Sequence, residues 1–141
     1  MGSVKIDIHE KDRKYTQTYA LNTPKGVKSL LQDRYRIAER RFKGDTAASD
    51  ILIDLSSAIE SAGLTQRQAE ALALVHGKWQ LTQSEAAEVM GVKQPMISQL
   101  LREVYDKLAS IYRKWNYGEF TVEYAEGDNN ERKTSVLRGS N

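Results

Sequence analysis

The sequence predicts a mainly α-helical fold, a helical bundle that ends in one long helix. Apolar residues recur at helical spacing in several stretches between residues 23 and 115. Two capping boxes, Thr65-Gln66-Arg67-Gln68 and Thr82-Gln83-Ser84-Glu85, mark helix starts. Glycines, which commonly follow the end of a helix, stand after the helical stretches at positions 44, 63, 77 and 91. We expect a short N-terminal arm before the bundle and a disordered or short-strand tail after it.

Pattern divides the chain into four segments. Residues 1–22 form an arm, in which residues 4–8 and 15–19 alternate in a way typical of a short strand pair or a flexible segment. Residues 23–63 form a helical region, with one helix from Thr23-Pro24 to Gly44 and another over 46–62. Residues 64–115 hold the remaining helices. Residues 116–141 form a flexible tail, in which only 120–124 have the pattern of a strand.

Composition argues against several kinds of site. The chain has no cysteine, which excludes disulfides, thiol catalysis and thiolate metal sites. His9 and His76 lie far apart, and the sequence has neither a phosphate-binding glycine loop nor a nucleophile motif. We therefore expect no enzyme, no metal and no cofactor. No stretch approaches 18 apolar residues. We expect no membrane partner and a cytoplasmic location, in a bacterial cell or in the host cell if the protein is phage-encoded.

The net charge of +2 conceals an uneven distribution. Residues 24–43 carry seven Lys or Arg against two Asp or Glu, and residues 93–115 carry five against two. Residues 44–92 carry two against seven. Solvated helix faces explain such blocks in many proteins, but clustered basic residues are also typical of nucleic-acid binding.

Residues 81–100 have the pattern of a helix-turn-helix. The capping box at Thr82 starts the first helix, and Ala87 supplies a small side chain where two helices cross. Gly91 suits a turn with positive φ, and Pro95 suits the first turn of the second helix. Apolar anchors toward the core follow at Val92, Ile97 and Leu100. The alternative is a short helical hairpin that never meets DNA.

In a helix-turn-helix, the second helix enters the major groove and its first turns face base edges. We expect the 94–112 helix to do so, with Gln reading adenine, Arg or Lys reading guanine, and Met contacting a thymine methyl. The start of the preceding helix is expected to hold a phosphate. The candidate DNA-binding residues are Thr82, Gln83, Ser84, Lys93, Gln94, Pro95, Met96, Ser98, Gln99 and Arg102, with Lys78 and Lys107 as further candidate phosphate contacts.

Residues 64–115 resemble region 4 of bacterial sigma factors, the four-helix module that reads the promoter −35 element. The resemblance runs from Leu64-Thr65-Gln66-Arg67-Gln68-Ala69 through Gly91-Val92 to Lys107-Leu108-Ala109. It implies that Thr82, Gln83 and Ser84 approach phosphates. It also implies that five residues lie in or beside the groove, namely Gln94, Pro95, Ser98, Gln99 and Arg102.

Two departures from the family pattern are visible. Lys93 stands where the family often has a Ser helix cap. The 63 residues before the module are too few for the region that melts DNA and reads the −10 element. We therefore expect a free-standing regulator of phage or prophage type rather than a complete sigma factor.

The last helix carries an apolar stripe with heptad spacing, at Ile97, Leu101, Val104, Leu108, Ile111 and Trp115. This stripe either packs on helices of the same chain or forms a homodimer seam through Val104, Leu108, Ile111 and Trp115.

The preferred functional hypothesis is a sequence-specific transcriptional regulator that binds double-stranded DNA. One alternative is a sigma-like or appropriator protein that docks on RNA polymerase through the acidic 46–62 helix. Another is a DNA-recognition subunit for viral genome packaging, of the small-terminase type.

Overall fold

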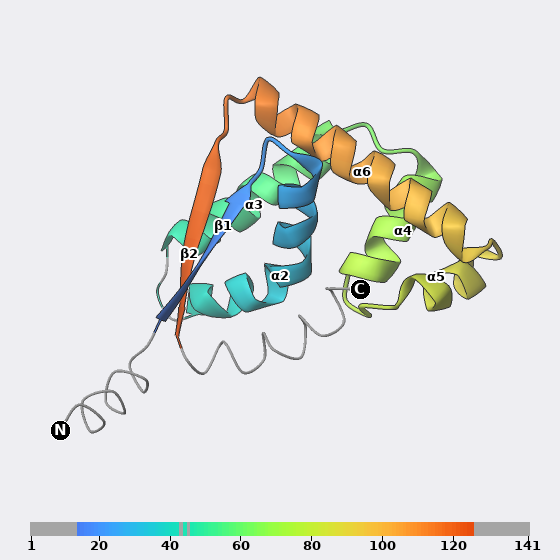
Figure 1. Cartoon of the computed structure of the whole chain (residues 1–141), viewed down its shortest axis with the longest axis horizontal. Coiled ribbons are helices and arrows are strands. Elements are labelled where there is room, and N and C mark those ends of the chain that lie inside the picture. The colour runs from blue at the N-terminus through green and yellow to red at the C-terminus, as the bar shows by residue number, and fades with distance from the viewer. Residues whose placement is uncertain (1–13, 43, 45, 126–141) are drawn as a thin grey trace. The chain divides into compact units, whose positions relative to one another are not determined.

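The computed structural model describes residues 14–42, 44 and 46–125 (Figure 1). Along the chain it contains β1 (Lys14–Ala20), α2 (Pro24–Phe42), α3 (Thr46–Ser61), α4 (Gln66–His76), α5 (Gln83–Met90), α6 (Gln94–Lys114) and β2 (Glu119–Ala125). The predicted fold class, mainly helical with a long final helix, is confirmed. The described residues form two compact units, one within residues 20–119 and one of residues 14–19 with 120–125.

The two strands form a two-stranded sheet, β1 with β2. The hydroxyl groups of Thr18 and Thr121 are hydrogen-bonded at 3.0 Å. Those of Tyr19 and Tyr124 are hydrogen-bonded at 2.8 Å. The strands predicted at 15–19 and 120–124 are therefore present. A strand pair within the N-terminal arm was one expectation, but the observed partner of β1 lies about a hundred residues along the chain. The arm's other predicted strand, at 4–8, lies outside the described residues.

Helix α6 is the centre of the helical unit, because it packs against each of α2, α3, α4 and α5. Figure 1 shows α5 beside the beginning of α6 and α2 beside its later half. The residues of α6 that this packing buries are Ile97, Leu100, Leu101, Val104, Tyr105, Leu108, Ala109 and Tyr112. Removing these apolar side chains from water is the main stabilising contribution to such a bundle.

Both predicted capping boxes are present. At the start of α4, Gln68 N–H donates to Thr65 Oγ1 (3.1 Å), and Thr65 N–H donates to Gln68 Oε1 (3.0 Å). At the start of α5, Glu85 N–H donates to Thr82 Oγ1 (3.1 Å), and Thr82 N–H donates to Glu85 Oε1 (2.9 Å). These bonds satisfy N–H groups that have no partner inside the helix, and they fix where each helix begins.

The dimer seam predicted on α6 needs correction. Val104 and Leu108 are fully buried within their own chain, so they have no surface to offer a second copy. Ile111 is half-buried, and only Trp115, at 41% exposure, reaches solvent well. The alternative that this stripe packs on the chain's own helices is therefore confirmed for its buried members. A homodimer through any other surface stays a prediction.

None of the helices in the described part of the chain combines the length and the apolar character needed to cross a membrane.

Candidate nucleic-acid interface

The turn between α5 and α6 has the geometry that the sequence predicted. Gly91 adopts φ 69° and ψ 33°, the left-handed region that favours glycine, and its N–H donates to the Ala87 and Glu88 carbonyls. Val92 N–H also donates to the Ala87 carbonyl, at 3.0 Å. The small side chain of Ala87 is buried where the two helices meet. These contacts fix the turn that follows α5 and sets the crossing of α5 and α6.

Helix α6 begins without a side-chain cap, as the Lys93 position predicted. The Lys93 side chain makes no capping hydrogen bond, and Pro95 lies in the first turn. The start is instead tied to α5, because Gln94 Nε2 donates to Gln83 Oε1. An amide pair between the two helices therefore ties the start of α6 to α5, although it does not accept from the backbone N–H groups that a cap would satisfy.

The first turns of α6 present a polar face to solvent. Gln94, Pro95, Gln99 and Arg102 are exposed and Ser98 is half-buried, and their spacing puts all five on one side of the helix. Arg102 Nη1 donates to Ser98 Oγ at 3.1 Å, and Gln99 Nε2 donates to Glu103 Oε2 at 3.3 Å. Two further candidates are exposed nearby, Lys93 and Met96. The structure therefore brings the candidate reading residues together on one accessible surface.

Lys107 is held away from this face. Its Nζ donates to Gln68 Oε1 at 2.8 Å and to the Gly63 carbonyl at 3.2 Å. Gln68 also donates to Glu103 Oε1 at 2.8 Å. Hydrogen bonds from Gln68 and then Gln99 are the main causes that lower the pKa of Glu103. Lys107 thus belongs to a polar cluster against the start of α4, and a phosphate contact there would require it to leave both partners.

The start of α5 was predicted to hold a phosphate. The capping box occupies the N–H groups of Thr82 and Glu85, which leaves those of Gln83 and Ser84 for an external acceptor. Thr82 and Ser84 are exposed, and Gln83 is half-buried. The Glu85 carboxylate adds negative charge at this same end. Anion binding here therefore depends on nearby cations as well as on backbone amides.

His76 is buried at the end of α4, and its Nε2 lies 2.7 Å from the Tyr105 hydroxyl. Burial, followed by the cations of Arg34 and Lys28, lowers the pKa of His76 to about 4. The ring is therefore neutral near pH 7. A neutral ring at the end of α4 fits a packing role.

Sequence reasoning did not single out Trp79, which is 65% exposed in the α4–α5 loop. Its only sequence signal is position, next to Lys78 and shortly before the capping box at Thr82.

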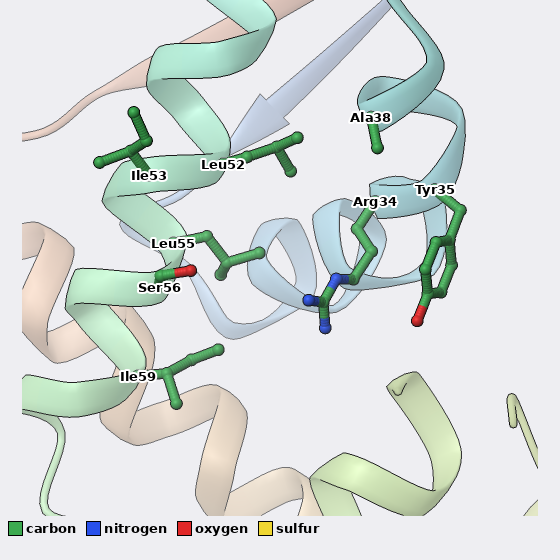
Figure 2. A pocket seen from close by; sticks show the side chains of 8 residues that line it. All are labelled: Arg34, Tyr35, Ala38, Leu52, Ile53, Leu55, Ser56 and Ile59. Carbon is green, nitrogen blue, oxygen red and sulfur yellow. The ribbon is translucent and has the colours of Figure 1, made fainter. Parts of the chain in front are cut away.

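A shallow pocket between α2 and α3 was also not predicted (Figure 2). It has a volume of about 230 Å³ and apolar walls from α3, with Arg34 and Tyr35 contributed by α2. None of the predicted site residues lines it. Among the described residues, no group of three or more His, Cys, Asp or Glu side chains is placed to hold a metal ion.

Residues 62–110 match the family described as Sigma-70, region 4. This stretch contains α4, α5 and most of α6, and it covers less than half of the chain. It is a sigma region 4-like helix-turn-helix of the DNA-binding kind, and the matched family is not a family of enzymes. Comparisons with curated proteins and with solved structures gave no match.

Proposed function

We propose, on the premise that residues 62–110 are a sigma region 4-like helix-turn-helix, that the protein is a sequence-specific transcriptional regulator. It binds double-stranded DNA by placing the first turns of α6 in the major groove of a promoter or operator. We further propose that it is a free-standing regulator of the phage or prophage type.

The observation that carries this proposal is the polar face at the beginning of α6. Gln99 and Arg102 are exposed side by side there, and both side chains are of types that pair with base edges. Arg102 is oriented by its bond to Ser98, and Gln99 by its bond to Glu103. Packing of α6 against four other helices supports this face from behind, so the reading residues project from a rigid element.

The test is in vitro selection from random duplex DNA at about 150 mM salt, where nonspecific phosphate binding is weak. We expect the wild-type protein to enrich one motif. Arg102→Ala and Gln99→Ala should each lower the discrimination between that motif and random DNA by about 1–3 kcal/mol. An inverted repeat in the motif would indicate that two copies bind together.

Lys114→Ala is the matched control, because it removes an exposed cation at the other end of the same helix. It should leave discrimination unchanged. If Arg102→Ala weakened binding to the selected motif and to random DNA equally, Arg102 would be a phosphate contact and not a base reader. Failure of the wild-type protein to enrich any motif would contradict the proposal.

A second candidate function, docking on RNA polymerase, is favoured by one observation on α3. Ile53 is 58% exposed and the acidic residue Asp50, one turn before it, is also exposed, so the outer face of this helix is apolar and negatively charged together. Retention of polymerase core enzyme by the immobilised protein without DNA, lost in Ile53→Ser, would support this function. No retention by the wild-type protein would exclude it.

A further inference from the structure

The loop between α4 and α5 presents a large aromatic side chain to solvent. Trp79 is 65% exposed, although removing an indole ring from water is strongly favourable. It stands three residues before Thr82, the N-cap of α5. An exposed tryptophan beside a proposed phosphate site has a surface suited to a partner with apolar and acceptor groups.

The backbone of this loop is held in place, so the exposure of Trp79 is built into the fold. Gln80 N–H donates to the Gly77 carbonyl at 3.2 Å, and Leu81 N–H donates to the Leu74 carbonyl at 2.9 Å. Gly77 packs so closely on α4 that a Cβ there would lie 2.1 Å from the Ala73 carbonyl oxygen. These contacts fix the chain on both sides of Trp79.

Cations from α2 lie beside the same loop. Arg34 Nη1 donates to the His76 carbonyl at 3.4 Å, and Lys28 is close enough to act electrostatically on the His76 ring. Figure 2 shows the Arg34 and Tyr35 side chains extending from α2 in the same general direction. Lys78 adds an exposed cation two residues after His76. Arg34 and Lys28 therefore lie near the end of α4, where the buried imidazole carries no charge, and Lys78 follows close behind in the chain.

We infer that Lys28, Arg34, Lys78 and Trp79 form a second DNA contact, to the sugar-phosphate backbone that flanks the groove entered by α6. In this contact the indole ring packs on deoxyribose and its N–H donates to a phosphate oxygen, while the cations lie along neighbouring phosphates. The surface supplies the positive charge that the α5 start lacks because of Glu85. It also gives the basic block of α2 a role beside the helix-turn-helix. This inference rests on the proposed function.

The experiment uses a 30-base-pair duplex of mixed sequence at about 50 mM salt, because a backbone contact does not depend on sequence. The chain has two tryptophans, so Trp115→Phe leaves Trp79 as the sole indole fluorophore. Its emission should change on binding, while duplex anisotropy independently reports the bound fraction. In the converse variant, Trp79→Phe, Trp115 is the sole indole fluorophore. That emission should stay constant, because Trp115 is not part of the proposed contact and α6 places it about 30 Å from the reading end of the helix.

Affinity measurements complete the test. Trp79→Ala should weaken binding to the mixed-sequence duplex about fivefold, the size expected for one packed aromatic side chain. Lys28→Ala and Lys78→Ala should each reduce the slope of log K against log salt by about 0.9, and Lys114→Ala should not. Circular dichroism would verify that each variant is folded.

Unchanged Trp79 emission at saturating anisotropy, with unchanged slopes, would overturn the second contact while leaving sequence reading by α6 intact. Absence of any duplex binding by the folded wild-type protein would overturn both proposals together. Loss of motif enrichment in the selection experiment, with Trp79 still responding to duplex, would overturn sequence reading alone and support the backbone contact.

Discussion

The two halves of α6 use the same side of one helix for different purposes. Ser98, Arg102, Tyr105, Ala109 and Tyr112 follow one another at spacings of four and three, so they form a single stripe. Arg102 is exposed and Ser98 is half-buried, but the last three members are buried. The stripe changes from a solvent-facing surface to core within one turn, between Arg102 and Tyr105.

This difference shows that the packing of neighbouring helices, and not helix periodicity alone, decides whether a helical face is exposed or buried. Near its beginning α6 lies beside α5, whereas α2 lies beside its later half. Buried apolar side chains hold α6 in place along its whole length, and in the first half they leave the polar side open to solvent. A surface presented by a packed helix in this way loses no precision to loop motion.

The largest expected effect comes from opening the buried half. Leu108→Ala should lower the free energy of unfolding by about 2–5 kcal/mol, because it leaves a cavity in the core of the bundle. Met96→Ala, at the open end of the same helix, should cost about 0.5 kcal/mol or less, since Met96 is 43% exposed. Urea denaturation of the two variants measures both effects. Equal losses would show that the two halves are not energetically distinct.

A second prediction concerns the first buried residue of the stripe, Tyr105, and its partner His76. The pKa of His76 is about 4 in the folded protein and about 6.5 unfolded, so the unfolded chain binds the extra proton as pH falls below 6.5. Stability present at pH 7 should therefore decline toward pH 4, with a loss of about 2 kcal/mol by pH 5. Urea denaturation at pH 7 and at pH 5 measures this loss in the free energy of unfolding. The His76→Gln variant should lack this part of the decline, and an unchanged decline would place its cause elsewhere.

The smallest expected effect concerns the open end of α6. Lys93→Ser should add the missing N-cap and raise the free energy of unfolding by about 0.5–1 kcal/mol. Lys93→Ala removes the same charge without supplying a cap, so the difference between the two variants isolates the cap. Thermal denaturation of both, beside the wild-type protein, is the measurement. If Ser were no better than Ala, the Ser hydroxyl would not be capping the start of α6.

Local signals allowed much of the helical unit to be predicted. The capping boxes at Thr65 and Thr82, and the turn at Gly91, depend on residues only a few positions apart, so they are legible in the sequence. The pairing of β1 with β2 joins segments about a hundred residues apart and has no local signal. The hydrogen bond from Lys107 to Gln68 likewise forms only when α4 and α6 pack together. For the same reason the position of α2 beside the α4–α5 loop was not foreseen.

The bond between Gln83 and Gln94 has one more consequence. In the free protein, one N–H of the Gln94 amide already donates to Gln83 Oε1, so a base contact made through that N–H is an exchange of one hydrogen bond for another. An exchange between equivalent bonds contributes little net affinity. A base edge that cannot replace the lost bond leaves an amide group unpaired, which costs about 1–3 kcal/mol. At this position, therefore, selectivity would come from rejecting wrong bases and hardly at all from attracting the right one.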